Sequence, residues 1–490
     1  MHPLFHTKWF HAVLAGVLLA GGVAMWNVLA CTQCRAYAAF QGATAAAAPA
    51  VLLPAPVPIS DYPKSDPAGR NLFLRWHKVR DDVAYELRLM QDGKVFFSSQ
   101  HIYVNGFHVV LPADFKGNSF EWQVRALNLD LQPTTAFSQS RRVYVDPKVN
   151  PVIYPIPMNG RNLLEDTDLG ARAGLPKKNG AYVPARAENV PAGLVAPEVF
   201  PHHNGTTAIN QVYKWIRVNG GETYEIEVLN SLPASDAEPA PAEKVIERAY
   251  STHFDLYDPQ KQVSSQPMYW RVRALDAQGR PIGVFCPPQQ FETNPRKHYT
   301  VGTLGDSITH GGGSVSGAPS DWEYDYQSYL KFDTINLGQS GDTSEATLAR
   351  FEDDVLPFHP EYLIIMTGSN SLRASYSARS IIGDLDAIRQ KCVDNGIKPV
   401  FLTIPPINPD NIAKAFNEPT DPAWMSKLAK INAYIRTQPH IELYTKFTEN
   451  QALPTSLAID GLHVGVEGKR LMAEAINEQW DDVLARYYGN

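Results

Sequence analysis

The stretch Gly305-Asp306-Ser307-Ile308-Thr309 follows the apolar, β-branched run Tyr299-Thr300-Val301-Gly302-Thr303-Leu304. That run is typical of a buried strand, and the glycine after it allows the chain a sharp exit. Ser307 is therefore expected at the carboxyl end of a strand, where open α/β sheets place ligands and reactive groups. A serine hydroxyl is a weak nucleophile at neutral pH. A catalytic role thus requires a base, a group that orients the base, and donors for a developing oxyanion.

From residue 298 to the end of the chain, short apolar runs alternate with segments of helical apolar spacing. After the first strand, further strands are predicted at 334–337, 362–367, 399–404 and 441–444, and helices at 378–395, 424–438 and 466–487. Five strands separated by helices predict a parallel, doubly wound α/β sheet. A length of about 190 residues suits one such domain.

Polar motifs follow the second and third strands, and another occurs near the end of the chain. They are Gly-Gln-Ser-Gly-Asp-Thr at 338–343, Gly-Ser-Asn-Ser at 368–371 and Asp-Gly-Leu-His at 460–463. Asp460 and His463 are three positions apart, so one short loop can present both. A carboxylate on one ring nitrogen then leaves the other nitrogen free to take a serine proton.

Together with the Gly-Asp-Ser stretch, these motifs make residues 298–490 resemble the SGNH, or GDSL, hydrolase family, whose fold is flavodoxin-like. The resemblance implies Ser307 as the nucleophile and His463 as the general base, with Asp460 orienting the imidazole. No Gly-x-Ser-x-Gly elbow of the α/β-hydrolase type surrounds Ser307. No metal or organic cofactor is implied.

The same resemblance implies an oxyanion hole made of the backbone N–H groups of Ser307 and Gly341 and the side-chain amide of Asn370. Gly338 is a nearby alternative to Gly341. The family usually has aspartate after the asparagine, whereas this chain has Ser371. That difference concerns the residues that support the site more than the reaction.

Three further features lie near the nucleophile in the sequence. His310 is an alternative base for Ser307. Gly311-Gly312-Gly313 lacks the following lysine of a phosphate loop and is expected to give a flexible or close-packed edge to the site. The segment Trp322, Glu323 and Tyr324 is expected to line an acyl or sugar pocket.

Earlier in the chain, one pattern occurs twice. Trp76 and Tyr85 are nine positions apart, as are Trp215 and Tyr224, and each pair lies in short alternating runs. Later, Phe-Glu-Trp-Gln-Val-Arg-Ala-Leu at 120–127 is answered by Met-Tyr-Trp-Arg-Val-Arg-Ala-Leu at 268–275. Two matching signatures in the same order indicate a duplicated unit.

The duplicated pattern predicts two antiparallel β-sandwiches and resembles fibronectin type III modules. The first is expected at 59–147 and the second at 191–293, with a linker at 148–190 between them. Their tryptophans could stack on carbohydrate, but at strand positions they are expected in the core; these are Trp76, Trp122, Trp215 and Trp270.

The amino end resembles an export signal. An apolar run at 12–29 precedes Val-Leu-Ala-Cys, which also resembles a lipoprotein processing site with Cys31 as the lipidated residue. A plain cleaved signal and an uncleaved anchor remain alternatives, since the run nearly spans a bilayer. The export segment is thus taken as 1–31, followed by an Ala/Pro-rich linker at 32–58, and the protein is expected at the cell surface or secreted.

The remaining cysteines and histidines indicate little chemistry. Cys31 and Cys34 have redox-pair spacing but no surrounding βαβ pattern, and Cys286 and Cys392 are expected as buried free thiols. The pair His202-His203 has no second cluster at ligand spacing and is read as a surface loop.

The net charge is −7, which offers no basic excess for a phosphate backbone, so nucleic acid is not an expected partner. The sequence therefore predicts an exported serine esterase acting on short acyl groups, acetyl above all, of a carbohydrate such as an acylated polysaccharide. A lipase or thioesterase of the same family is an alternative. So is a surface carbohydrate-binding or adhesion protein with an idle hydrolase domain. The sequence does not indicate an oligomeric state.

Overall fold

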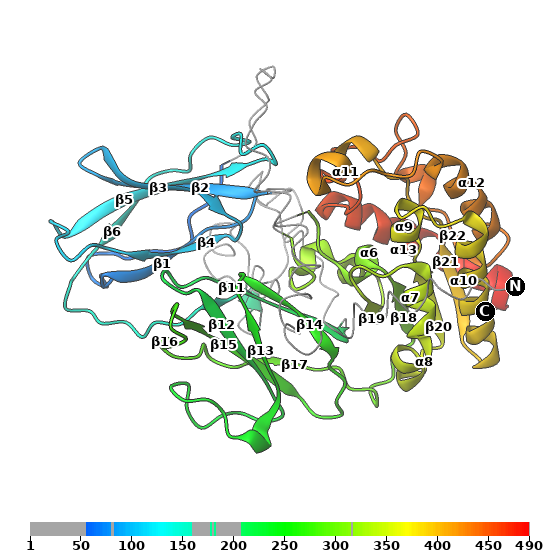
Figure 1. The fold of residues 1–490 in the computed structure, drawn as a ribbon, viewed down its shortest axis with the longest axis horizontal. Helices are drawn as coiled ribbons and strands as arrows, with labels where there is room; N and C mark the ends of the chain where they lie inside the picture. Colours follow the sequence, from blue (N-terminus) through cyan, green and yellow to red (C-terminus); the bar gives the residue numbers. More distant parts are fainter. Residues whose placement is uncertain are drawn as a thin grey trace, which may run out of the picture.

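The computed structural model describes residues 55–79, 83–158, 207–314 and 317–489, together with the backbone of β8 (Lys177–Lys178) and β9 (Ala181–Tyr182). The expectations for the export segment, for Cys31 and Cys34, and for His202 and His203 lie outside the described residues. Among the described helices, none is both long and apolar enough to cross a membrane. Figure 1 shows two β-rich modules beside an α/β domain.

The carboxyl-terminal domain contains a six-stranded sheet in the order β10-β19-β18-β20-β21-β22, and every pairing within it is parallel. This confirms the predicted parallel sheet. Its strands are β10 (Thr207–Ala208), β18 (Val301–Gly305), β19 (Thr334–Gly338), β20 (Tyr362–Met366), β21 (Lys398–Leu402) and β22 (His440–Ile441). The last strand is shorter than expected, and the 3₁₀ turn η6 (Tyr444–Lys446) follows it.

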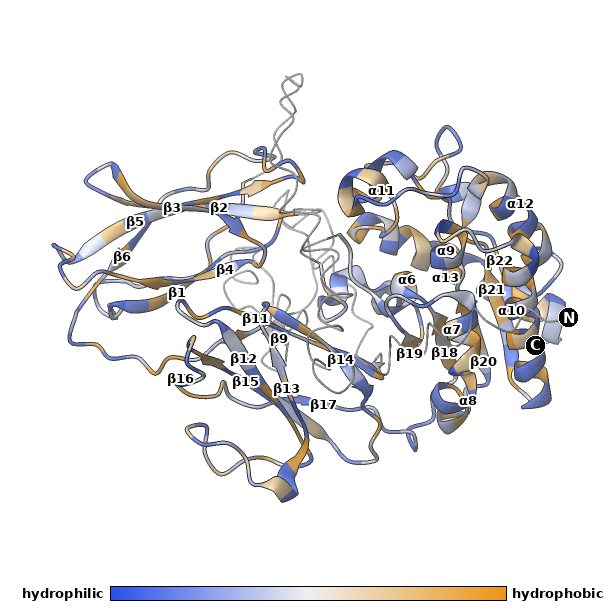
Figure 2. Cartoon of the chain, viewed as in Figure 1, coloured by the Kyte–Doolittle hydropathy of each residue, from blue (hydrophilic) through white to orange (hydrophobic). Residues whose placement is uncertain are grey.

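Alternation along the strands divides the core between the two faces of this sheet. On β20, Leu363 and Ile365 pack in one hydrophobic cluster, whereas Ile364 and Met366 pack in the other. Helices α8 (Phe351–Asp354), α10 (Ala378–Asp394) and α12 (Trp424–Ile435) contribute to the first cluster, and α13 (Val466–Tyr488) contributes to the second. A strand buried on both faces reads as a continuous apolar run, which is why the sequence located these strands. Figure 2 shows hydrophobic residues concentrated on β20 and β21.

Short helices and 3₁₀ turns connect the strands. They are α6 (Ser307–His310), η3 (Trp322–Tyr324), η4 (Tyr326–Tyr329), α7 (Ser344–Ala349), η5 (Leu356–Phe358), α9 (Ser369–Arg373) and α11 (Pro409–Phe416). Among them, α6 and α9 carry parts of the polar motifs.

The first module has a two-stranded sheet, β1-β4, and a four-stranded sheet, β3-β2-β5-β6, both antiparallel. Side chains from both sheets form one core, in which Trp76 and Trp122 are fully buried. The strands are β1 (Asn71–Arg75), β2 (Ala84–Gln91), β3 (Lys94–Ile102), β4 (Gly106–Val110), β5 (Ser119–Leu127) and β6 (Arg141–Tyr144). Val57 and Pro58, predicted as linker, already bond to this module at His77 and Trp76.

The second module is also antiparallel, with sheets β13-β12-β15-β16 and β14-β11-β7. Its core contains Trp215 and Trp270, so all four tryptophans lie inside as expected. The fibronectin type III identity of both modules stays a prediction. The strands are β7 (Ile156–Pro157), β11 (Asn210–Ile216), β12 (Thr223–Leu229), β13 (Val245–Ser251), β14 (Asp255–Lys261), β15 (Met268–Leu275), β16 (Pro281–Ile282) and β17 (Gln289–Phe291), with the 3₁₀ turn η2 (Ala242–Lys244).

Two short strands lie in parts of the fold that the sequence did not predict. β7, from the predicted linker at 148–190, pairs with β11 and so belongs to the second module. β10, from the region assigned to the second module, pairs in parallel with β19 and forms the edge of the carboxyl-terminal sheet. Two residues carry too little pattern to identify a strand, so neither pairing is predictable from local sequence.

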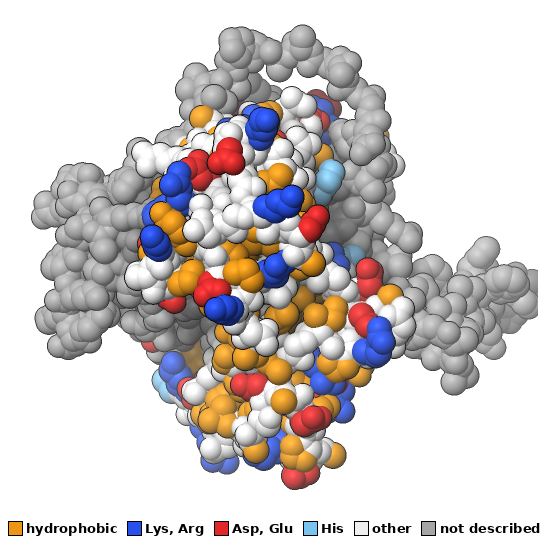
Figure 3. All heavy atoms as spheres, turned by 90° about the vertical axis from the view of Figure 1, so that its left-hand side faces the viewer, with side chains coloured by type: hydrophobic (Ala, Val, Ile, Leu, Met, Phe, Trp, Pro, Cys, Tyr) orange, Lys and Arg blue, Asp and Glu red, His pale blue; other side chains and the backbone are white. Residues whose placement is uncertain are grey.

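The outer face of the first module carries exposed apolar side chains. Val95, Phe96 and Phe97 on the edge strand β3 are exposed, as is Val110 on β4. Figure 3 shows hydrophobic side chains on this side of the molecule interspersed with charged ones.

A buried ionic cluster joins all three parts of the fold. The Asp321 carboxylate, from the α/β domain, lies 2.7 Å from the Lys214 ammonium of the second module and 2.8 Å from the Lys78 ammonium of the first. All three side chains are at most 4% exposed. Although burial by itself disfavours a carboxylate, Lys214 and Lys78 hold the pKa of Asp321 at about 2.

We expect Asp321→Asn to destabilise the protein strongly, because it removes the carboxylate that lies within 2.8 Å of both buried ammonium groups. Breaking a buried pair in this way costs about 3–5 kcal/mol. The matched control is Asp481→Asn, which removes the exposed partner of Lys331 and should cost at most about 1 kcal/mol. Urea unfolding midpoints measure both. Equal midpoints for the two variants would contradict a stabilising role of the cluster.

The Asp321 carboxylate also predicts how the stability of the protein depends on acid pH. Since the folded pKa of Asp321 lies below its ordinary value of 3.8, its contribution is complete above that value and is lost as the pH falls towards 2. This part of the acid dependence should be absent in Asp321→Asn.

Candidate active site

Ser307 begins α6 at the carboxyl end of β18, as predicted. The Asp306 carboxylate caps this short helix by accepting a hydrogen bond of 3.1 Å from the Ile308 N–H. The Ser307 hydroxyl lies 2.9 Å from Nε2 of His463, although the two residues are 156 positions apart. The sheet thus brings a hydroxyl and an imidazole into hydrogen-bond contact.

The segment Asp460-Gly461-Leu462-His463 fixes the imidazole from the other side. Oδ1 of Asp460 accepts from the backbone N–H groups of Leu462 and His463, while Oδ2 lies 2.9 Å from Nδ1 of His463. Gly461 has φ +79°, and a Cβ there would lie 2.4 Å from the Asn408 carbonyl oxygen, so the turn requires glycine.

The charges in this turn agree with its hydrogen bonds. Burial alone would raise the pKa of Asp460, but the charge and hydrogen bonds of His463 and the bonds from the turn hold the pKa below its ordinary value. A carboxylate at this position keeps a proton on Nδ1 of His463. Nε2 is then left to accept from the Ser307 hydroxyl.

The three expected oxyanion donors come from neighbouring strand ends. The Ser307 N–H belongs to the first residue of a helix and therefore has no intrahelical acceptor. Gly341 has φ +92°, and a Cβ added there would meet no atom within 4 Å, so its backbone is open to a ligand. The Asn370 amide donates one hydrogen to the Asp342 carbonyl oxygen at 2.9 Å, which leaves its second hydrogen available.

The two alternative residues have other contacts. A Cβ on Gly338 would lie 2.2 Å from the His310 backbone nitrogen, so this glycine allows close packing of two strand-end segments. His310 contacts Ser340 through Nδ1 and the Asn210 carbonyl oxygen through Nε2, and neither bond goes to Ser307. Burial lowers the pKa of His310 to about 4.

The segment 322–324, expected from the sequence to line a pocket, packs against the glycine run at 311–313. Glu323 lies 3.5 Å from the Lys78 ammonium, which also sits 5.3 Å from the Tyr324 ring, and Trp322 packs in the hydrophobic cluster with Ile308. All three side chains are buried. The structure therefore places Glu323 and Tyr324 against Lys78 of the first module, and Trp322 in a core of the α/β domain. The glycines at 311–313 pack closely, since a Cβ on the third would lie 2.6 Å from the Tyr324 ring.

Arg350 holds the strand ends together and was not anticipated from the sequence. Its guanidinium donates to the carbonyl oxygens of Gly305 and Leu337, at the ends of β18 and β19, and to the Asp342 carboxylate at 2.6 Å. It also pairs with Asp354, which in turn pairs with Lys261 of the second module. No local pattern marks an arginine for such a role.

Lys469 is a second buried cation close to the nucleophile. Its ammonium donates to the Ile308 carbonyl oxygen at 2.6 Å. Burial lowers its pKa to about 8, against the opposing charges of Asp325, Asp306 and Asp460. Burial likewise raises the pKa of Asp306 to about 6.

Ser371, where the resemblance leads one to expect aspartate, supports the start of α7. Its hydroxyl accepts from the Ser344 N–H at 2.8 Å and lies 3.1 Å from the Ser344 hydroxyl, which donates to the Asp384 carboxylate at 2.6 Å. A carboxylate from α10 thus reaches this network through Ser344.

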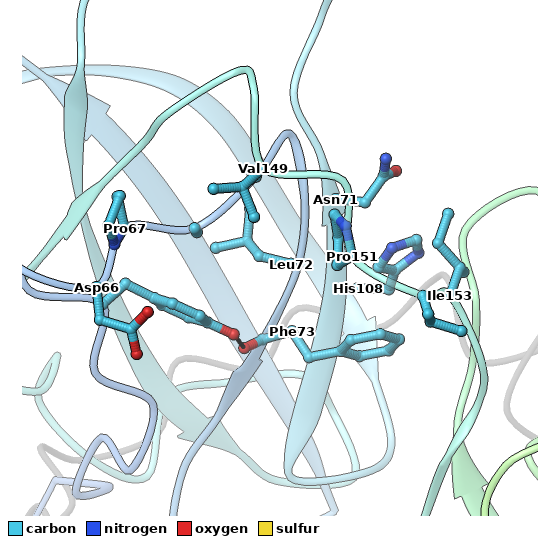
Figure 4. Close-up of a pocket in the computed structure, with 13 residues that line it drawn as sticks. Asp66, Pro67, Asn71, Leu72, Phe73, His108, Val149, Pro151 and Ile153 are labelled. Carbon is cyan, nitrogen blue, oxygen red and sulfur yellow. Dashed lines mark hydrogen bonds between the residues drawn. The ribbon is translucent and has the colours of Figure 1, made fainter.

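A separate pocket of about 180 Å³ lies between the first module and the segment after it. Figure 4 shows Pro151 and Ile153 beside His108, whose ring stacks on Phe73 at 4.5 Å. Its lining includes none of the candidate catalytic residues. Within the described ranges, no group of three His, Cys, Asp or Glu side chains could hold a metal ion.

Comparisons with known proteins bear on the α/β domain. Residues 303–471 match the model of the GDSL-like lipase/acylhydrolase family. One curated relative, an uncharacterized lipoprotein, YqeF, from Bacillus subtilis, is 30% identical over 131 residues, which cover 23% of this chain and 51% of the relative. The chain thus spans about half the length of this relative.

Solved structures similar to this chain include three hydrolases. A GDSL-like lipase from Bacteroides thetaiotaomicron is 25% identical, with a TM-score of 0.29, covering 38% of this chain and 88% of that one. A lipase/acylhydrolase from Enterococcus faecalis is 21% identical, with a TM-score of 0.31 and coverages of 37% and 95%. A catalytic mutant of an acetylxylan esterase from Geobacillus stearothermophilus is 18% identical, with a TM-score of 0.29 and coverages of 37% and 93%.

We expect Ser371→Asp to destabilise the protein, because it would put a second carboxylate near Asp384, across the Ser344 hydroxyl. The penalty should shrink by about 0.5–3 kcal/mol in the Asp384→Asn background, since the two sites contact the same group. A double-mutant cycle on urea unfolding measures this coupling. Ser371→Ala is the control, with a loss of about 1–3 kcal/mol from the unpaired Ser344 N–H in both backgrounds. A coupling of zero would contradict the proximity of the two carboxylates.

Proposed function

Because residues 303–471 form a domain of the GDSL-like lipase/acylhydrolase family, we propose that this protein is a serine esterase that removes short acyl groups from a carbohydrate. The single observation that carries the proposal is the chain of contacts from Asp460 through His463 to Ser307, with both hydrogen-bond distances at 2.9 Å. This is the spacing that general-base activation of a serine requires.

In the proposed reaction, the Ser307 oxygen attacks the ester carbonyl carbon while Nε2 of His463 takes the hydroxyl proton. The tetrahedral oxyanion accepts hydrogen bonds from the N–H groups of Ser307 and Gly341 and from the Asn370 amide. The C–O bond to the alcohol then breaks, and His463 returns the proton to the leaving alcohol. Water, deprotonated by His463, attacks the acyl-enzyme and releases the carboxylic acid and the free serine. Asp460 stabilises the imidazolium in both halves.

The proposed preference for short acyl groups is supported by the low exposure of the two residues that would react with the ester. Ser307 is 7% exposed and His463 is 9% exposed. The Phe416 ring lies edge-on to the His463 imidazole with centroids 6.1 Å apart, and the Arg373 guanidinium covers that ring at 5.1 Å. An aromatic and cationic rim suits a polar alcohol such as a sugar better than a long aliphatic chain.

The proposal places the protein outside the cytoplasm, on the cell surface or secreted, with Cys31 as the residue that would carry a lipid. Its support is the apolar run before Cys31 and the printed name of the curated relative, a lipoprotein. Export would bring the esterase into contact with acylated polysaccharides, which is the support for a carbohydrate substrate.

The first test is Ser307→Ala assayed on p-nitrophenyl acetate, butyrate and octanoate, followed by an acetylated xylan. We expect wild-type turnover to be fastest on acetate and to fall by at least four orders of magnitude in the variant, because the nucleophile is lost. An unchanged circular-dichroism spectrum serves as the folding control. If wild type and variant are equally inert on every ester while both are folded, the domain is no esterase. Retention of both on a polysaccharide would then support a binding protein.

Asn370→Ala tests the oxyanion hole separately. Loss of one donor should lower kcat about 10²–10³-fold with little change in KM, because the hydrogen bond forms fully only in the transition state. The control is Asn395→Ala, which removes a surface amide that donates to the Lys391 carbonyl oxygen at the end of α10 and should leave kcat unchanged. Equal kcat values for the two variants would exclude Asn370 from the hole.

A further inference from the structure

Asn210, the first residue of β11, belongs to the second module but contacts two motifs of the α/β domain. Its side-chain amide donates to the Gly338 carbonyl oxygen at 2.8 Å, and its backbone carbonyl oxygen lies 2.7 Å from Nε2 of His310. Gly338 opens the motif that contains Gly341, and His310 ends the helix that Ser307 begins. One buried residue of the module therefore touches two of the three segments that supply the candidate oxyanion hole.

The hydrogen bonds of His310 define its tautomer. A carbonyl oxygen can only accept, so Nε2 carries the proton that is shared with Asn210. Nδ1 is then the acceptor for the Ser340 N–H at 3.2 Å and the Ser340 hydroxyl at 2.9 Å. The ring is 3% exposed, and the low pKa caused by its burial keeps it neutral. The neutral imidazole thus links a carbonyl of the second module to both polar groups of Ser340.

Ser340 is the residue that sets the direction of the Gly341 N–H, because the two share a peptide plane. Gly341 itself has no side chain, and no atom lies within 4 Å of where its Cβ would be. Its position therefore depends on what holds its neighbours. On one side Ser340 is held by His310, and on the other Asp342 is held by Arg350 at 2.6 Å.

The module approaches the same motif along two further paths. β10 pairs with β19, and the Ile209 N–H donates to the Asn336 carbonyl oxygen, two residues before Gly338. The Lys261 ammonium pairs with Asp354, which pairs with Arg350 and so with the Asp342 side of Gly341. These contacts of the module therefore lie on or next to the segment 338–342, whereas the Lys214–Asp321 pair does not.

We propose that the second module is a positioning element of the oxyanion hole, acting on the Gly341 N–H through Asn210, His310 and Ser340. This inference rests on the proposed esterase function. Neither Asn210 nor His310 touches the reacting atoms, so both are positioning residues. A misdirected donor weakens the transition state more than the bound substrate, so the effect appears in kcat rather than in KM.

Two substitutions of His310 separate the two halves of the link in the full-length protein. In His310→Asn, the side-chain oxygen can take the place of Nδ1 and keep the bond to Ser340, while the contact with Asn210 is lost. In His310→Gln, the side-chain nitrogen can take the place of Nε2 and keep the bond to Asn210, while the contact with Ser340 is lost. We expect both to lower kcat on p-nitrophenyl acetate about 10- to 100-fold, since displacement of a catalytic group by about 1 Å can cost that much. KM should stay within about threefold.

The matched control is Thr207→Val, which removes the hydrogen bond from the Thr207 hydroxyl to the Glu292 carbonyl oxygen. It leaves the contacts of His310 with Asn210 and Ser340 in place. It should keep the wild-type kcat. If the His310 variants do not fold, Asn210→Ala is the milder variant. It removes the bond to Gly338 and should lower kcat about threefold to tenfold at unchanged KM. Wild-type kcat in the folded His310 variants, or an equal loss in Thr207→Val, overturns the proposal.

Amide hydrogen exchange over residues 338–343 measures how firmly His310 holds this segment, and the measurement does not depend on enzymatic turnover. The exchange should be faster in both His310 variants and unchanged in Thr207→Val. If the wild type hydrolyses no ester and its Ser307 does not react with diethyl p-nitrophenyl phosphate, the esterase function has failed. Exchange then decides the inference alone: faster exchange supports the holding of this segment by the module, and unchanged exchange overturns it.

Discussion

The register of the parallel sheet is the constraint on which the candidate site depends. Gly305 at the end of β18 pairs with Gly338 on one side and with Met366 on the other, so the three strands end at one level. The motifs that follow these strands therefore lie at one edge of the sheet. His463, from the segment 460–463, contacts Ser307 at this edge. A shift of one residue in any pairing would turn the strand's side chains to the opposite face. Because side chains on both faces of β20 are buried, such a shift would exchange the side chains that pack in the two cores.

The same strand-end logic explains what the sequence alone could predict. Apolar runs followed by small polar residues predicted the parallel sheet, and the resemblance to SGNH hydrolases implied the roles of Ser307, Asp460 and His463. Those inferences are local, because each depends on a run of five to ten residues. The burial of the four tryptophans followed in the same way from strand position.

The contacts that the sequence did not indicate join distant segments through single residues. From the sequence, His310 is an alternative base. In the structure its partners are Ser340 and Asn210, the latter 100 positions away. Arg350 belongs to no motif, and Glu323 and Tyr324 lie against Lys78 of the first module, a contact that no local pattern indicates. Such pairs depend on how whole modules pack, and a periodic pattern of apolar residues holds no information about which polar residue will face which.

The edge strand β10 has a consequence for how the chain is divided. Two residues at 207–208 complete the sheet, whereas its next strand in sequence begins at 301. Strands β11 to β17 of the second module therefore lie between two strands of the α/β sheet in the sequence, whereas its strand β7 precedes both. A fragment cut at the apparent boundary near 298 would leave the outer side of β19 with unpaired backbone groups, and open sheet edges are templates for association between chains. Aggregation of such a fragment would reflect a missing strand and would say nothing against the fold of the intact protein.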